Sequence, residues 1–348
     1  MTEKEIHQHR KDEHLSLAVK YWKKGLETPS GLGFQDLRLV PQALPEIALN
    51  EVDLSVPIFG GRFDFPFYIE AMTGGSAHGD KLNEQLAEIA ANQHLALAVG
   101  SQSIALKFPE LAAGFARVRE INPTGFIFAN IGAGHGLEQA KRAVDMLKAN
   151  ALEIHINTAQ ELTMKENEGD RSFYWLENIH EIAEKLDVPV IVKEVGFGIS
   201  RGIFEQLKQT AVSAVNVGGK SGTDFAWIEH QRGGDFELIG HGFTTVESLL
   251  EAQFAKTQLP VIATGGIRCA EDVFKSQILG AILVSSAGFI LQNLIQDGPD
   301  KVEQILENWK SDLTKFYTLF GVKNLTELSK IETLYSADMR AFIEQRNF

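Results

Sequence analysis

Between residues 67 and 320, short apolar runs alternate with amphipathic stretches, and this alternation leaves few possible folds. Eight runs have the length of strands, and they cover residues 67–73, 95–100, 126–131, 151–157, 189–195, 212–217, 260–264 and 281–285. Eight strands that alternate with helices are what a TIM (β/α)8 barrel requires, so the sequence predicts an α/β fold of this type. A doubly wound open sheet is the alternative. It usually has fewer strands and a glycine fingerprint after the first one, which Met72-Thr73-Gly74-Gly75 does not match.

Helices are predicted between these strands, and residues 1–66, which precede the first strand, do not show the same alternation. The helical stretches include residues 80–92, 138–149, 175–186, 246–255 and 300–320. Residues 1–66 lack the alternation and contain a charged helical segment over residues 7–24, so we expect an N-terminal extension followed by a barrel domain over 67–348. The connection over 218–259 is long, polar and rich in glycine, which is typical of a functional loop.

Charge and composition restrict the partners. The formal net charge is -13, and an acidic surface disfavours nucleic acid and anionic membranes as partners. No apolar run is long enough to span a bilayer, and the polar start does not resemble a signal peptide. The single cysteine, Cys269, cannot form an intrachain disulfide, which together with these features predicts a cytoplasmic protein. An anionic substrate would require a local concentration of cations.

Polar side chains follow the ends of three consecutive predicted strands. In the fourth strand, alternation places Glu153, His155 and Asn157 on the face opposite the apolar residues, which points them into the barrel. Asn130 and Lys193 lie near the ends of the neighbouring strands, and Gln160 and Glu161 follow in the next loop. The carboxyl ends of barrel strands carry active sites, so we expect a site here, although each residue alone could also be a satisfied core polar group.

Two glycine-containing turns follow the last two strands. Thr264-Gly265-Gly266-Ile267-Arg268 comes after the seventh strand, and Ser285-Ser286-Ala287-Gly288 opens a helical stretch after the eighth. TIM barrels often bind a phosphate at this position, where glycine lets backbone N–H groups approach the oxygens. The position favours phosphate binding over the alternative of two ordinary turns.

A cluster of basic residues lies near the N-terminus. In His9-Arg10-Lys11-Asp12-Glu13-His14, a helix would place Arg10 and His14 on one face. Arg10, Lys11 and His14 could then bind a second anionic group. A solvated charged helix is the alternative, and it is the usual outcome for such a run.

Several motifs, taken together and in order, resemble one enzyme family. They are Arg10-Lys11-Asp12-Glu13-His14, Met72-Thr73-Gly74-Gly75, Gly100-Ser101-Gln102, His155-Ile156-Asn157 with Gln160-Glu161, Val192-Lys193-Glu194-Val195-Gly196, and Gly265-Gly266-Ile267-Arg268. This ordered set, which runs over nearly the whole chain, resembles the type 2 isopentenyl-diphosphate isomerases. The resemblance implies a flavoprotein that interconverts isopentenyl and dimethylallyl diphosphate in isoprenoid biosynthesis. It also implies reduced FMN, Mg²⁺ and NADPH as reductant, and a homo-oligomer that is a tetramer or larger.

The resemblance also implies roles for individual residues. The flavin would contact Ala71, Met72, Thr73, Ser101, Asn130, Lys193, Ser221 and Thr223, and its phosphate would contact Gly266, Ile267, Arg268, Ala287 and Gly288. The substrate would contact Arg10, Lys11, His14, Ser101, Gln102, Ser103 and Gln160. Glu161 would bind Mg²⁺ with Asn157 beside it, and Gln160 and His155 would lie at the reacting carbons. The flavin N5 would be the main acid and base.

One position departs from the family pattern, and two other functions compete. The family often has an arginine after its Ser-Gln pair, where this chain has Ser103, so another cation would have to complete the diphosphate site. An FMN-dependent 2-hydroxy-acid oxidase or dehydrogenase is one competitor. Those oxidases carry a histidine base in the loop after the sixth strand, and no histidine is expected in this loop here, which reads Gly218-Gly219-Lys220-Ser221. A phosphate-binding barrel without catalytic activity is the other competitor, because fold alone does not imply function.

Overall fold

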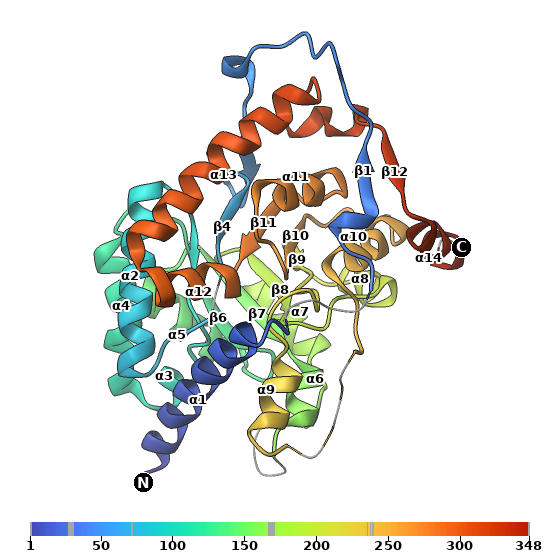
Figure 1. Cartoon of the computed structure of the whole chain (residues 1–348). Helices are drawn as coiled ribbons and strands as arrows, with labels where there is room; N and C mark the ends of the chain where they lie inside the picture. Colours follow the sequence, from blue (N-terminus) through green and yellow to red (C-terminus); the bar gives the residue numbers. More distant parts are fainter. Residues whose placement is uncertain are drawn as a thin grey trace.

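Eight parallel strands close into a barrel in the computed structural model, which describes residues 2–26, 31–70, 72–165, 171–234, 236, 238 and 240–346 (Figure 1). The barrel strands are β4 (Phe67–Ile69), β5 (Leu97–Ala98), β6 (Ile127–Gly132), β7 (Ala151–Ile156), β8 (Val190–Glu194), β9 (Ala214–Asn216), β10 (Val261–Thr264) and β11 (Leu283–Ser286). Each predicted apolar run overlaps one of these strands, and β6 and β11 each end one residue beyond their run, so the prediction of a TIM barrel is confirmed. Most strand residues are buried, because one face meets the helices and the other meets the barrel core.

Helices lie around the outside of the barrel and at its carboxyl end (Figure 1). They are α2 (Ala77–Gln93), α3 (Ser103–Lys107), α4 (Ala112–Ile121), α5 (Leu137–Leu147), α6 (Thr158–Thr163), α7 (Leu176–Lys185), α8 (Arg201–Leu207), α9 (Phe225–Gln231), α10 (Thr245–Phe254), α11 (Ala270–Ile278), α12 (Gly288–Asp297) and α13 (Pro299–Leu319). The helices predicted from the sequence all occur, with ends shifted by a few residues. The long connection over 218–259 contains two of them, α9 and α10. Among the described residues, no helix has the length and apolarity needed to cross a membrane.

The N-terminal region contributes to both ends of the barrel. Helix α1 (Glu3–Lys23) begins with a capping box, in which Thr2 and Glu5 satisfy each other's backbone N–H groups. The helix buries Leu15, Ala18, Tyr21 and Trp22 and packs beside α9 and α12. The hairpin of β2 (Val56–Ile58) and β3 (Gly61–Phe63) packs against inward side chains such as Tyr68 and Phe128, at the opposite end of the barrel.

The two ends of the chain also meet. Strand β1 (Leu37–Leu39) pairs antiparallel with β12 (Thr333–Tyr335), and α14 (Ala337–Arg346) follows (Figure 1). Sequence alternation did not predict this two-stranded sheet, because each strand has only three residues and its partner is about 300 positions away.

Candidate active site

A cavity of about 710 Å³ lies at the carboxyl ends of the barrel strands, where α1 borders it. Most residues predicted for the site line it: Arg10, Lys11, His14, Met72, Thr73, Ser101, Ser103, Asn130, His155, Asn157, Gln160, Glu161, Lys193, Thr223, Gly266, Ile267, Arg268, Ala287 and Gly288. Gln102 and Ser221 do not line it, and Ala71 lies outside the described residues. The fold therefore brings together side chains from the N-terminal helix and from most of the barrel.

The loops after β10 and β11 form a cradle of backbone at one end of the cavity. Gly265 and Gly266 have φ angles of +109° and +71°, which favour glycine. A Cβ atom at Gly266 would lie 2.5 Å from the carbonyl oxygen of Ser221, so no larger residue fits without movement. Gly288 opens α12 directly beside this turn. Glycine backbone and a helix N-terminus suit a phosphate group, and Arg268 at the same end adds positive charge.

Ser221 supports this cradle from behind. Its hydroxyl accepts a hydrogen bond from the backbone N–H of Thr245, at 3.3 Å. The Thr245 hydroxyl in turn donates to the carbonyl oxygen of Thr264 or Gly265, at 2.9 and 2.7 Å. The Ser221 side chain therefore holds the glycine turn in place rather than reaching the cavity.

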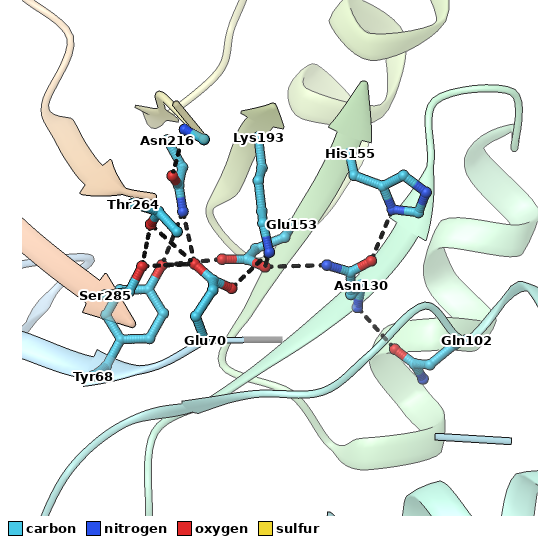
Figure 2. Close-up of polar contacts among 11 residues, drawn as sticks. Tyr68, Glu70, Gln102, Asn130, Glu153, His155, Lys193, Asn216, Thr264 and Ser285 are labelled. Carbon is cyan, nitrogen blue, oxygen red and sulfur yellow. Dashed lines mark hydrogen bonds and ion pairs between the residues drawn. The ribbon is translucent and has the colours of Figure 1, made fainter. Parts of the chain in front are cut away.

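A buried polar network fills the barrel core where it meets the cavity, and Figure 2 shows its hydrogen bonds. The Lys193 ammonium lies 2.7 Å from Glu70 and 3.5 Å from Glu153. Asn216 and Ser285 donate to the second oxygen of Glu70, at 2.8 and 2.7 Å. Burial lowers the pKa of Lys193, but the charges of Glu153 and Glu70 outweigh it and raise the pKa, so this lysine stays charged.

A chain of amides orients His155 at the cavity wall (Figure 2). Asn130 donates its amide to Glu153 at 3.1 Å, which leaves its oxygen to accept from Nδ1 of His155 at 2.9 Å. Burial, followed by the charges of Lys193 and Lys11, lowers the pKa of His155 to about 3, so the ring is neutral at pH 7. His155 therefore carries its proton on Nδ1 and presents an unprotonated Nε2.

Gln102 acts on Asn130 and not on the cavity, which differs from its predicted role as a substrate contact. Its side-chain oxygen accepts the backbone N–H of Asn130 at 2.9 Å, and its amide donates to the carbonyl oxygen of Ala143 at 2.9 Å. The side chain is fully buried between β6 and α5. Gln102 therefore holds the strand that carries Asn130.

A second cluster lies at the mouth, where α1 meets α9. His14 lies 2.7 Å from Glu229, and Gln160 donates to the same carboxylate at 2.9 Å. Burial raises the pKa of Glu229, but His14, Gln160 and Arg232 outweigh it and lower the pKa to about 2. Burial also lowers the pKa of His14, so Arg232 is the cation that balances Glu229 at neutral pH.

Asn157 and Glu161 lie together beside this cluster. The Asn157 amide donates to Glu161 at 2.9 Å and lies 3.3 Å from the oxygen of Gln160. Among the described residues, no group of three or more His, Cys, Asp and Glu side chains could hold a metal ion. A cation bound at Glu161 would thus take further ligands from amide, water or substrate oxygens, as Mg²⁺ commonly does.

Two serines and a histidine line the wall between α1 and α3. Ser103 lies 2.9 Å from the Ser101 hydroxyl and 2.8 Å from Nε2 of His135. Lys11 donates to the carbonyl oxygen of Ser101 at 3.2 Å. Arg142 also lines the cavity and donates to the carbonyl oxygen of Leu106 in α3, at 3.2 Å. The uncharged Ser103 thus contacts His135, and its neighbour Ser101 contacts Lys11.

Comparison with known proteins identifies the family. A protein named isopentenyl-diphosphate delta-isomerase from Lactococcus lactis is 63% identical over 346 residues, which cover 99% of each chain. A second one, from Latilactobacillus sakei, is 45% identical over 345 residues, or 98% of this chain and 97% of the relative. The chain belongs to the isopentenyl-diphosphate delta-isomerase family. The resemblance seen in the sequence motifs is thereby confirmed, and the protein is an enzyme.

The FMN-dependent character of this isomerase family member has independent support. Residues 110–333 match the family of FMN-dependent dehydrogenases. A mandelate oxidase variant is similar in structure with a TM-score of 0.60 and 14% identity, covering 87% of this chain and 88% of the oxidase. A flavocytochrome b2 variant with benzoylformate has a TM-score of 0.65 and 18% identity, covering 88% and 78%. These two structures share the barrel fold.

A hydroxy-acid oxidase would need a histidine base in the connection after β9, and this isomerase-family chain has no such histidine at the described part of the cavity. The connection after β9 contains two histidines, His230 in α9 and His241 beyond it, and neither lines the cavity. The histidines that do line it are His7, His14, His135 and His155, from α1 and the wall formed by β6 and β7.

Several residues of the site were missed from the sequence. Glu70 directly follows the first strand, and Glu229 lies within a predicted loop. Glu194 is buried at the cavity and accepts hydrogen bonds from the backbone N–H groups of residues 196–198. Burial raises its pKa to about 8 in spite of these bonds. Glu70 had a usable signal, because strand alternation places it on the same inward face as Tyr68.

Proposed function

We propose that the protein interconverts isopentenyl diphosphate and dimethylallyl diphosphate by a 1,3-transfer of a proton, with FMN in the reduced state and Mg²⁺ bound. The observation that carries the proposal is a single cavity with two ends suited to anions. The glycine cradle at Gly265 and Gly266 lies at one end, and the cations of α1 lie at the other. The 63% identical relative bears the name of this activity.

The cradle end would hold the FMN phosphate. Gly266, Ile267, Arg268, Ala287 and Gly288 would surround it. The flavin ring would then lie toward the barrel core, against Met72, Thr73, Ser101, Asn130, Lys193 and Thr223. A positive charge at Lys193 would stabilise negative charge on the pyrimidine side of a reduced flavin.

The other end would bind the diphosphate. Arg10 and Lys11 border the cavity from α1, and His14 lies one turn further on. Ser101, Ser103 and His135 form the facing wall. We infer that His135, whose pKa is lowered by burial, contributes a hydrogen bond and not a positive charge at the position of Ser103. Residues 1–66 would thus be an extension that carries part of the substrate site.

Glu161 would bind Mg²⁺ together with the diphosphate oxygens, and Asn157 would orient its carboxylate. Glu161→Gln keeps the shape of the side chain but removes its charge. We expect this variant to need a much higher Mg²⁺ concentration for half-maximal activity. Wild-type activity at the same low Mg²⁺ would remove Glu161 from the metal site.

The side chains near the reacting carbons are poor acids for protonating an alkene. Gln160 does not titrate near neutral pH, and His155 is neutral at pH 7 with Nε2 unprotonated. Glu161 is assigned to the metal. FMN in the reduced state would supply a transferable proton at N5. Gln160, held by Glu229, and His155, held by Asn130, would instead orient the substrate.

The decisive test of the proposed isomerisation is whether turnover consumes reductant, because an isomerisation involves no net oxidation or reduction. Substrate and product are isomers, so one chemical reduction of the enzyme should support many turnovers under anaerobic conditions, and oxidised enzyme should be inactive. In D2O, deuterium should enter the product at the protonated carbon. Consumption of one reductant per product would instead favour a dehydrogenase. NADPH is the proposed physiological reductant, and NADH is the comparison.

We further propose a cytoplasmic homo-oligomer of four or more subunits that acts on a small molecule and not on nucleic acid or membranes. Its acidic charge of -13 is the supporting observation for the last point. Light scattering of the purified protein would test the subunit number, and a monomer would contradict it.

A further inference from the structure

Three ionisable side chains share the barrel core, and only one of them is a cation. Glu70, Glu153 and Lys193 are 2%, 0% and 5% exposed. Lys193 lies 2.7 Å from Glu70 and 3.5 Å from Glu153 (Figure 2). If both carboxyl groups were ionised, the barrel core would carry a net negative charge that water cannot reach, and such a buried charge is strongly unfavourable.

Among the described residues, the other groups that face this trio do not supply a second positive charge. They lie on the same strands or on other strands of the barrel and are Tyr68, Asn130, His155, Asn216, Thr264 and Ser285. Burial raises the pKa of Tyr68 well above its ordinary value, and that of His155 is lowered to about 3, so both are neutral at pH 7. A bound proton is therefore the remaining way to balance the charge.

The hydrogen bonds indicate which carboxyl group holds the proton. Glu70 has the shorter contact with Lys193 and accepts from Asn216 and Ser285 at 2.8 and 2.7 Å. Glu153 has only longer contacts, with Asn130 at 3.1 Å and Tyr68 at 3.1 Å. The single Tyr68 hydroxyl proton can serve only one of the two carboxylates at a time. Glu70 is thus the better stabilised anion.

The charge environment of Glu153 agrees with this assignment. Burial and the charge of Glu70 outweigh the attraction of Lys193 and raise the pKa of Glu153 to about 8. Because Glu153 and Glu70 lie on either side of the same lysine and the same tyrosine hydroxyl, the two carboxyl groups behave as a pair with one proton.

We propose that Glu153 carries a proton at neutral pH and shares it with Glu70, and that this proton keeps the cavity floor around Lys193 uncharged overall. Glu70 and Lys193 line the cavity, and Glu153 lies behind them. Loss of the proton leaves a net negative charge beneath a cavity whose two ends suit anions. Glu153 is therefore a positioning residue that sets the charge of the floor, and its effect on FMN rests on the proposed function.

Infrared spectroscopy of the full-length protein tests the proton directly, without any ligand. Glu194 is a second buried carboxyl group with a pKa of about 8, so the titration is read in a Glu194→Gln background, which serves as the matched control. We expect a carbonyl band of a buried carboxylic acid at pH 7 that disappears near pH 8 to 9. Adding Glu153→Gln should remove this band. A band that is absent at pH 7, or one that persists with Glu153→Gln, would overturn the proposal.

Lys193→Met gives a second measurement if the double variant does not fold. An ammonium group favours carboxyl ionisation, so its removal should move the band's titration to higher pH. An unchanged midpoint would show that Lys193 does not influence the pair and would overturn the proposal.

FMN binding tests the consequence for the cavity. Between pH 7 and pH 9, the dissociation constant of FMN should rise about tenfold more in the Glu194→Gln control than in the double variant. Equal pH dependence in both would overturn the role of Glu153 in setting the floor charge. A protein that binds no FMN at any pH would instead contradict the proposed function, and the infrared titration would remain decisive for the proton.

Discussion

Two lysines face the same cavity from different regions of the molecule, and their surroundings are opposite. Lys193, at the end of β8, lies within 3.5 Å of two carboxyl groups, which raise its pKa. Lys11, on α1, donates to a carbonyl oxygen, and burial and the charge of Arg10 lower its pKa to about 8. The barrel supplies its own counter-charges to Lys193, whereas Lys11 lies beside another cation.

The charge of Lys193 is therefore neutralised within the folded protein, whereas the charge of Lys11 is suited to binding an anion from outside. Removing Lys193 leaves buried carboxyl groups without their cation, so the folded state itself should suffer. Removing Lys11 relieves repulsion with Arg10 in the free enzyme, so the loss should appear only when an anion binds. The following variants test this comparison in order of decreasing effect.

The largest effect is expected for Lys193→Met. Breaking a buried ion pair by removing one partner costs about 3–5 kcal/mol, and proton uptake by Glu70, the carboxylate paired with Lys193, should reduce this toward the lower end. Urea unfolding at pH 7 would measure the loss, with Lys11→Met as the matched control, for which we expect a change below about 0.5 kcal/mol. Equal stability losses in the two variants would contradict the distinction. FMN affinity of Lys193→Met should also fall.

Next in size is the effect of the α1 cations on substrate binding. Arg10→Gln or Lys11→Gln should raise KM by a factor that corresponds to about 1.5–3 kcal/mol, the contribution of a hydrogen bond to a charged group. FMN affinity and the flavin spectrum should not change. If deleting residues 1–14 leaves KM intact, the segment is only a solvated helix.

The pH dependence of Lys11 should give a moderate effect. Its pKa of about 8 means that it is protonated at pH 7 and loses its charge as the pH rises through 8. Because kcat/KM reports groups of the free enzyme, kcat/KM should fall above pH 8. Lys11→Arg keeps the charge and should move this fall to higher pH. The same fall in both proteins would assign it to another group, such as Glu194.

His135 should have the smallest effect. It joins the wall through a neutral hydrogen bond to Ser103, and burial lowers its pKa. His135→Gln should raise KM about twofold to tenfold, which corresponds to about 0.5–1.5 kcal/mol for one hydrogen bond. Ser103→Ala is the control that keeps the histidine but removes its partner. A KM equal to that of the wild type in both variants would exclude this wall from the substrate site.

The sequence predicted the barrel because strand and helix periodicity are local properties. Each strand buries apolar residues at fixed spacing, and the turns after β10 and β11 contain the glycines that a phosphate cradle needs. The inward direction of His155 and Lys193 followed from the same alternation. The motifs in their order also identified the family before any comparison, since they cover nearly the whole chain.

Only the tertiary structure decided how these side chains are paired. Glu70 and Lys193 are 123 residues apart in the chain, and His14 and Glu229 are 215 apart, so no local pattern reports their contact. Gln102 has a polar side chain next to Ser101, yet it turns away from the cavity to hold Asn130. Residue type determines what a group can do chemically, but burial and neighbours from distant strands determine its charge and direction.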